Sequence, residues 1–305
     1  PGQGSQSIGM LAALGAAHPQ VRASFDEASA AIDLDLWALA QQGPEGELNR
    51  TINTQPALLA AGVGVWRAWR AAGGAEPAFM AGHSLGEYTA LVCAQALELA
   101  DAARLVRERG RLMQAAVAEG EGAMAAVLNA ELSLLHEVCA EASQIGQPVV
   151  AANLNAPGQI VISGASAAVE RALALLAERG IKRVIRLPVS VPSHSPMMQS
   201  AAAGLQPLLA ATPIRAPKIP VIHNADVQMH RNPDAIRSVL ARQLCEPVRW
   251  IESIELIASR GVTHVLECGP GKVLCGLVKR IAPTLSIHAI GDAAAFDTAL
   301  TEARA

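Results

Sequence analysis

The sequence lacks the features that mark proteins acting on membranes or on nucleic acids. It contains no run of basic residues, and its formal net charge is −3, which argues against nucleic-acid binding. The uncharged stretch 148–169 is interrupted by Asn, Gln, Pro and Gly, so it is unsuited to cross a bilayer. We also expect no signal peptide. We therefore expect a soluble, cytoplasmic protein with neither a nucleic-acid nor a membrane partner.

Cysteine is scarce and lacks the spacing of a metal or redox site. The chain has five cysteines, an odd number, and no Cys-x-x-Cys pair. Most lie within apolar segments, which is typical of reduced thiols in a protein core. We therefore expect no disulfide and no zinc site, and we expect these residues to be buried: Cys93, Cys139, Cys245, Cys268 and Cys275.

Apolar residues are abundant, and their periodicity predicts an α/β fold. With 305 residues, 51% hydrophobic and 17% charged, the chain can bury a large core, as one large domain or as a domain with an insertion. Helical and strand patterns alternate at both ends of the sequence, which is typical of a mainly parallel sheet. The predicted helices are 55–72, 101–118, 234–260 with a break near Pro247, and 272–281; the predicted strands are 78–81 and 262–266.

The middle of the chain follows a different order. Its pattern reads strand, helix, strand, strand, helix, strand, which is the ferredoxin-like unit. The predicted elements are 122–128, 131–144, 148–154, 159–163, 165–179 and 182–187. We therefore predict a large hydrolase-like domain from residues 1–120 and 190–305, interrupted by a ferredoxin-like insert at 121–189. A substrate is expected in the cleft between the two parts.

A Gly-x-Ser-x-Gly motif carries the strongest signal for chemistry. The apolar run 78–81 stops at Gly82, Ser84 follows two residues later, and Gly86 opens a helical pattern. A serine on such a strand-to-helix turn projects from the sheet, and the glycines remove side chains that would clash there. The following backbone N–H, on Leu85, can face the negative oxygen of a tetrahedral intermediate. An ordinary glycine-rich turn is the alternative, but the flanking strand and helix favour a nucleophile elbow.

A nucleophilic serine needs a base, and eight histidines are available. His194 lies in the proline-bracketed loop 189–196, which leaves the last strand of the insert and can direct a side chain into a cleft. Position alone leaves it as likely to be a turn residue as the base, and His223 is the second candidate. The remaining histidines lie in exposed, helical or strand patterns, or in the elbow itself.

The chain begins in a glycine-rich loop at residues 1–6. The loop lacks the third glycine of a dinucleotide fingerprint, so it does not predict a nucleotide cofactor. Because the loop has no strand before it, we expect a strand and the initiator Met upstream.

Six segments together resemble one enzyme family. In order along nearly the whole chain they are 1–6, 82–88, 155–159, 189–194, 243–250 and 269–274. This series is similar to the motifs of malonyl-CoA:acyl carrier protein transacylases of bacterial fatty-acid synthesis. The resemblance implies a hydrolase-like domain with a ferredoxin-like insert, in agreement with the periodicity. It also implies that malonyl-CoA and acyl carrier protein are the substrates and that no metal or redox cofactor is required.

The resemblance assigns roles to individual residues. It makes Ser84 the nucleophile, His194 the base, and Arg109 the anchor of the malonyl carboxylate. A guanidinium can hold a carboxylate through two parallel hydrogen bonds. Without the resemblance, the sequence pattern would favour a solvent-exposed Arg109 on a charged helix face.

Further assignments concern the oxyanion hole and the substrate pocket. The backbone N–H of Gln3 is implied as a donor beside that of Leu85, and His194 is implied to face a backbone carbonyl near Gln243. Ser84 and His194 then form a catalytic dyad, without the carboxylate that completes a Ser-His-Asp triad. The residues expected to contact substrate are Arg109, Met113, Asn155, Ser193 and Gln243.

Several alternatives remain open at this point. An acyltransferase domain of a polyketide or fatty-acid megasynthase would carry similar motifs, although the small Ser193 favours the stand-alone enzyme. A serine thioesterase would share the elbow but would pair its histidine with an acid and have no use for Arg109. A non-catalytic scaffold would lack Ser84 or His194. We also expect a monomer.

Overall fold

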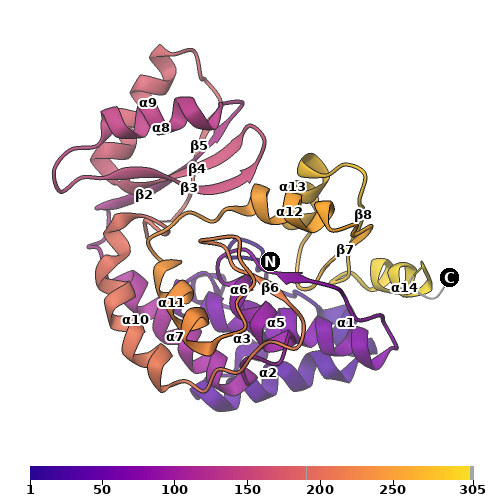
Figure 1. Ribbon diagram of the computed structural model, residues 1–305. Helices are drawn as coiled ribbons and strands as arrows, with labels where there is room; N and C mark the ends of the chain where they lie inside the picture. Colours follow the sequence, from indigo (N-terminus) through magenta and orange to yellow (C-terminus); the bar gives the residue numbers. More distant parts are fainter. Residues whose placement is uncertain (190, 303–305) are drawn as a thin grey trace.

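The computed structural model describes residues 1–189 and 191–302 of the chain (Figure 1). Ser190, which belongs to the loop predicted to carry the base, and residues 303–305 lie outside the described residues.

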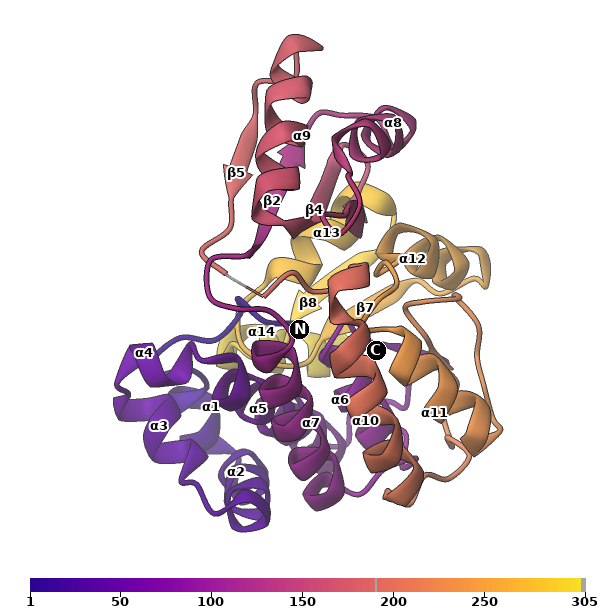
Figure 2. The same cartoon turned by 90° about the vertical axis from the view of Figure 1, so that its left-hand side faces the viewer.

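A layer of helices forms the base of the larger body. Its central element is α5 (Thr51–Ala71), and both α2 (Pro19–Ile32) and α7 (Leu99–Ala115) pack against it (Figure 2). Helix α5 begins four residues before the predicted start at residue 55, so that Pro56 lies inside the helix, in its second turn. The short helices around this layer are α1 (Ala12–Ala17), α3 (Leu36–Gln42) and α4 (Glu45–Leu48).

Two parallel strand pairs lie beside the helical layer. Strand β1 (Met80–Ala81) pairs with β6 (Val221–Ile222), and β7 (His264–Glu267) pairs with β8 (Ser286–Ala289). Strand β1 is shorter than the predicted strand 78–81. The helices of this part are α6 (Gly86–Cys93), α10 (Gln199–Ala211), α11 (Pro233–Arg242), α12 (Trp250–Ser259), α13 (Val273–Ile281) and α14 (Ala293–Glu302), with a 3-10 turn at Pro196–Met198.

A cavity of about 630 Å³ lies between the two parallel pairs, and Pro1, Phe79 and Val265 are among its lining residues. The strand expected upstream of Pro1 stays a prediction.

The central segment forms the predicted β-α-β-β-α-β unit. Its antiparallel sheet has the order β3-β4-β2-β5, with helices α8 and α9 on the face turned away from the larger body (Figure 1). Apolar side chains of these helices and of the sheet form a separate core cluster that includes Val138, Ile162 and Val169. The elements are β2 (Gly122–Leu128), α8 (Leu132–Ala142), β3 (Val149–Ala156), β4 (Gln159–Ala165), α9 (Ser166–Glu178) and β5 (Val184–Arg186). The predicted fold class is confirmed.

The free edge of β3 is tied to the larger body. Leu154 N–H donates to the carbonyl of Val248 at 2.9 Å, and Val248 N–H donates to the carbonyl of Ala152 at 2.8 Å. These two bonds extend the sheet by one bridge onto the segment that links α11 and α12. The segment around Val248, just before α12 begins at Trp250, is therefore held against the insert.

The cysteine prediction needs a correction. All five thiols are free, but only Cys93 and Cys139 are buried, while the other three are half-buried. Cys245 lies after the end of α11 and Cys268 after the end of β7, while Cys275 lies in the first turn of α13 (Val273–Ile281), where the side chain is not among the buried residues of the helix. Within residues 1–189 and 191–302, no cluster of metal-ligating side chains occurs. No helix of this part of the chain is long and apolar enough to span a membrane.

Candidate active site

Ser84 occupies a strained turn between β1 and α6. Its φ is +53°, in the left-handed region that non-glycine residues rarely adopt. The turn requires glycine nearby, because a Cβ added to Gly82 would lie 1.9 Å from the carbonyl carbon of Gly86. The backbone N–H of Ser84 donates to Oδ1 of Asn224 at 2.7 Å, and Nδ2 of Asn224 donates to the carbonyl of Gly82 at 2.7 Å. The turn therefore has the geometry of a nucleophile elbow, and the Asn224 side chain stabilises its backbone through these two hydrogen bonds.

His194 lies against the Ser84 hydroxyl. Its Nε2 is 2.8 Å from Ser84 Oγ, and its Nδ1 is 2.7 Å from the backbone carbonyl of Gln243. The side chain is buried, and burial, followed by the positive charge of Arg109, lowers the pKa of His194 to about 3. The ring is then neutral near pH 7. Since the carbonyl can only accept a hydrogen bond, Nδ1 carries the proton and Nε2 is free to accept the one on Ser84 Oγ.

Arg109 extends from α7 to the same hydroxyl and is 1% exposed. One terminal nitrogen donates to Ser84 Oγ at 3.2 Å and to Gln243 Oε1 at 3.0 Å, and the other donates to Gln55 Oε1 at 2.8 Å. The guanidinium also lies over the ring of Tyr88, with 5.6 Å from Cζ to the ring centroid. Within the described residues it makes no ion pair. Burial lowers the pKa of Arg109, yet the group remains a cation because its usual value is so high.

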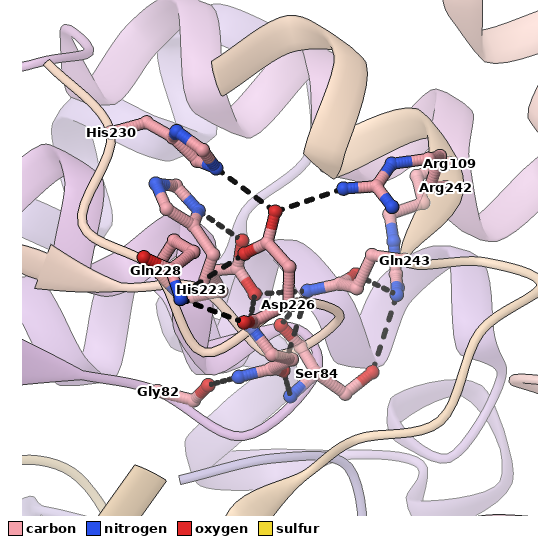
Figure 3. A network of polar contacts seen from close by, with 11 residues as sticks. Gly82, Ser84, Arg109, His223, Asp226, Gln228, His230, Arg242 and Gln243 are labelled. Carbon is pink, nitrogen blue, oxygen red and sulfur yellow. Dashed lines mark hydrogen bonds and ion pairs between the residues drawn. The ribbon is translucent and has the colours of Figure 1, made fainter. Parts of the chain in front are cut away.

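Gln243 connects these three groups. It follows the C-terminal end of α11, is fully buried, and uses both its backbone and its side chain. Its backbone carbonyl accepts from His194 Nδ1. Figure 3 shows its side chain between the other two: Oε1 accepts from Arg109, and Nε2 donates to the carbonyl of Ser84 at 3.0 Å. One residue therefore sets the distance between the histidine and the arginine around the serine hydroxyl.

The predicted oxyanion donors lie where the elbow begins its helix. In residues 1–189 and 191–302, no hydrogen bond occupies the N–H of Leu85 or of Gln3. The N-terminal loop packs on the elbow, since a Cβ added to Gly2 would lie 3.0 Å from the carbonyl oxygen of His83. The Gln3 side chain donates to Thr51 Oγ1 at 3.2 Å, so its orientation is set by α5. Both backbone donors are thus available for an oxyanion.

The other residues expected to contact substrate, Met113, Asn155 and Ser193, differ in burial and in hydrogen-bond partners. Met113 is buried on α7, where its sulfur accepts from Gln55 Nε2 at 3.5 Å. Asn155 is half-buried at the end of β3, and its Oδ1 lies 2.8 Å from His83 Nε2. Burial lowers the pKa of His83 to about 4, so the neutral ring donates through Nε2 to that oxygen. Ser193 forms a turn in which its N–H donates to the carbonyl of Val191 at 2.8 Å.

His223, the second candidate for the base, does not reach Ser84. It is fully buried, and its Nδ1 lies 2.7 Å from Oε1 of Glu87. Its other ring nitrogen, Nε2, has no hydrogen-bond partner in the described part of the chain, whereas Nε2 of His194 occupies the place beside Ser84 Oγ, so His223 is not positioned as the base in this arrangement. The sequence ranked His194 first because of its proline-bracketed loop and His223 second, and the structure agrees with that order.

Sequence reasoning missed three polar residues that hold the site: Gln55, Glu87 and Asn224. All are nearly or fully buried, at 1%, 0% and 0% exposure. Gln55 follows the polar residues Asn53 and Thr54 at the start of α5 and comes just before the apolar run of the helix, so its local pattern does not distinguish it from an ordinary polar first turn. Asn224 follows β6, the parallel partner of the strand that leads into the elbow, so its place beside Ser84 follows from the pairing of β1 and β6.

Comparison with known proteins decides the family. Residues 1–283 match the family model of the acyl transferase domain. The malonyl CoA-acyl carrier protein transacylase of Salmonella typhimurium is 53% identical over 302 residues, covering 99% of this chain and 97% of that protein. The chain belongs to the malonyl CoA-acyl carrier protein transacylase family. It is an acyltransferase.

Solved structures of this family have the same fold as this acyltransferase. The malonyl-CoA:acyl carrier protein transacylase of Xanthomonas oryzae superposes with a TM-score of 0.97 at 56% identity, covering 99% of this chain and 96% of that one. A malonyl-transacylase solved in complex with its type II PKS acyl-carrier protein gives 0.97 at 51% identity, covering 99% and 97%. The family predicted from the six motifs is confirmed.

Proposed function

We propose that this protein transfers the malonyl group from malonyl-CoA to the phosphopantetheine thiol of acyl carrier protein, through a malonyl ester on Ser84. The relative from Salmonella typhimurium carries the corresponding name, and one structural relative was solved with its carrier protein. The arrangement of Ser84, His194 and Arg109 supports the same reaction in this chain.

The first half-reaction uses the neutral histidine. As Ser84 Oγ attacks the thioester carbonyl, its proton passes to Nε2 of His194, 2.8 Å away. The imidazolium that forms is stabilised by the Gln243 carbonyl at Nδ1. The negative oxygen of the tetrahedral intermediate is placed on the N–H groups of Leu85 and Gln3. When the C–S bond breaks, His194 returns the proton to the leaving thiolate of coenzyme A, and the malonyl ester remains.

The single observation that carries the choice of acyl group is the unpaired cation beside the nucleophile. Arg109 is 1% exposed, is held by neutral oxygens and makes no ion pair in the described part of the chain. A buried charge without a counterion is costly, and an incoming carboxylate relieves that cost. Since its terminal nitrogen is 3.2 Å from Ser84 Oγ, the carboxylate and the reacting carbonyl must belong to one small acyl group. Malonyl has this form.

The second half-reaction reverses the first with a different thiol. The phosphopantetheine thiol of acyl carrier protein enters the place that coenzyme A left, and His194 takes its proton as the sulfur attacks the ester. No step requires a metal or a redox cofactor, and coenzyme A serves only as part of the substrate. Met113, Asn155 and Ser193 are proposed to line the path of the acyl group and its thioester arm.

The insert and the larger body have separate parts in this proposal. Residues 121–189 act as a domain of their own that bounds one side of the cleft, while 1–120 and 190–305 carry the nucleophile, base and arginine. We propose that the protein acts in the cytoplasm as a monomer, without contact to nucleic acid or membrane. The megasynthase alternative keeps the same chemistry and stays open. The thioesterase alternative loses support, because His194 faces a backbone carbonyl instead of an acid.

Intact-protein mass spectrometry tests the proposal. Incubation with malonyl-CoA should add one malonyl group to the enzyme, and addition of the phosphopantetheinylated carrier protein should move that group onto the carrier. Release of free malonate without a malonyl-carrier product would favour the thioesterase. Absence of any acyl-enzyme would contradict the ester intermediate.

A further inference from the structure

Glu87 is a buried carboxylate that the reaction itself does not use. It lies in the first turn of α6, three residues after Ser84, and is 0% exposed. Its oxygens face three donors: Nδ1 of His223 at 2.7 Å, the backbone N–H of Asn224 at 2.9 Å and Nε2 of Gln243 at 2.8 Å. Within the described residues the carboxylate makes no hydrogen bond or ion pair with Ser84 Oγ or Arg109, so any effect that it has through hydrogen bonds must pass through a neighbour.

Gln243 is the neighbour whose orientation matters. A glutamine amide has one accepting and one donating end, and the two ends are interchangeable in shape. A carboxylate accepts hydrogen bonds, so Glu87 favours the NH₂ end of Gln243 on its own side, and the backbone carbonyl of Ser84, which accepts from the same nitrogen at 3.0 Å, favours the same direction. The Oε1 end then faces Arg109, which can only donate, at 3.0 Å. If the amide were reversed, two donors would face each other at Arg109.

We propose that Glu87 is a positioning residue that fixes the amide of Gln243, and thereby holds Arg109 in the orientation that receives the acyl carboxylate. The inference rests on the proposed function, because it assigns Arg109 to the substrate carboxylate. It adds a chain of contacts that runs from Glu87 through Gln243 to Arg109. The same glutamine holds His194 through its backbone carbonyl, so that contact does not depend on the direction of the amide.

A competing account is that Glu87 acts only by its negative charge, as a distant counterion for Arg109. Two conservative variants separate the accounts. Glu87→Asp keeps the charge but withdraws the oxygens by one methylene, which breaks the 2.8 Å contact with Gln243. Glu87→Gln removes the charge but keeps a side chain of the same length, so its amide oxygen can still accept from Nε2 of Gln243.

The Glu87→Gln variant can also satisfy its other neighbours. Its oxygen can take the N–H of Asn224 and the Nε2 of Gln243, which share one oxygen of Glu87 in the structure. Its NH₂ can donate to Nδ1 of His223 if the imidazole proton moves to Nε2. That atom is buried and has no hydrogen-bond partner in the described part of the chain, so it can carry the proton.

The experiment measures rates of enzyme acylation by malonyl-CoA and acetyl-CoA for wild type, Glu87→Asp and Glu87→Gln. A lost hydrogen bond to a charged group changes a rate by roughly tenfold or more. We expect Glu87→Asp to lower the malonyl-to-acetyl ratio by at least about tenfold, and Glu87→Gln to lower it by less than about threefold. Thermal unfolding of each variant checks that the ratio is measured on folded protein.

The outcomes separate the possible errors. Equal ratios in wild type and Glu87→Asp would overturn the positioning role, and a larger loss in Glu87→Gln than in Glu87→Asp would show that the charge acts instead. A lowered melting temperature with an unchanged ratio would leave Glu87 with a structural role only, which also overturns the inference. Failure of the wild-type protein to form a malonyl ester would instead count against the proposed function.

Discussion

Replacing Arg109 by alanine removes the buried cation that donates to Ser84 Oγ and that we propose receives the acyl carboxylate. In the Michaelis complex the two terminal nitrogens of the guanidinium can each donate to one carboxylate oxygen. Each hydrogen bond to a charged group contributes roughly 1.5–3 kcal/mol. Loss of even one such bond lowers malonyl transfer by about tenfold or more, since about 1.4 kcal/mol corresponds to a factor of ten.

The substitution also disturbs the protein, and this part of the loss is shared by all substrates. Gln55 and Gln243 each lose a donor to a buried oxygen, and Ser84 loses a contact at 3.2 Å. Acetyl-CoA has the same thioester but no carboxylate, so it experiences only this shared loss. The ratio of malonyl to acetyl transfer therefore isolates the carboxylate contact.

The assay is acylation of Arg109→Ala and wild-type protein by the two thioesters, with Arg109→Lys as the matched control. We expect the ratio to collapse in the alanine variant. In the lysine variant the ratio should fall less, because the positive charge remains. It should still fall, because an ammonium cannot donate two parallel hydrogen bonds to a carboxylate. Equal losses for malonyl and acetyl in Arg109→Ala would refute the assignment and leave Arg109 as a structural residue.

Three further predictions follow from the same geometry. His194→Ala should lower acylation by about two to four orders of magnitude, as expected for loss of a general base; a loss below threefold in a stopped-flow assay would place the base elsewhere. The pKa of His194 is about 3 in the folded protein against a usual value of 6.5, so its contribution to stability is complete above pH 6.5 and is lost as the pH falls toward 3. Urea titrations should therefore show a smaller loss of unfolding free energy between pH 6.5 and 4 in His194→Gln than in wild type, and parallel curves would contradict the lowered pKa. Asn224→Ala leaves the N–H of Ser84 and the carbonyl of Gly82 without partners, and should cost about 1–3 kcal/mol of stability for each unpaired group; an unchanged melting temperature would show that other contacts hold the elbow.

The sequence predicts those parts of the site that local chemistry controls. The elbow is visible because its strained turn admits only glycine at residue 82, and this requirement is local to the turn. The order of the six insert elements is visible because each has the periodicity of a strand or a helix. The strand before the elbow is shorter than its apolar run, because only Met80 and Ala81 find a parallel partner in β6.

Residues that act through tertiary contacts are harder to read. The proline-bracketed loop of His194 made it the first candidate for the base, but the sequence could not show that His194 faces Ser84 while His223 faces Glu87. Arg109 shares its helix with exposed arginines, so its 1% exposure depends on packing against α5 and on the loop after α11. The resemblance of the six motifs to the family assigned His194 as the base and Arg109 as the carboxylate anchor. Hydrophobic periodicity alone could not assign either role.

The central claim is that Ser84 carries the acyl group between the two thiols. Peptide mapping by mass spectrometry after brief incubation with malonyl-CoA tests it most directly, on wild-type protein and on Ser84→Ala, with melting curves to confirm that both are folded. The account predicts a malonyl ester only on the wild-type peptide that contains Ser84. An ester on another residue, or one that persists in the folded Ser84→Ala variant, would contradict it.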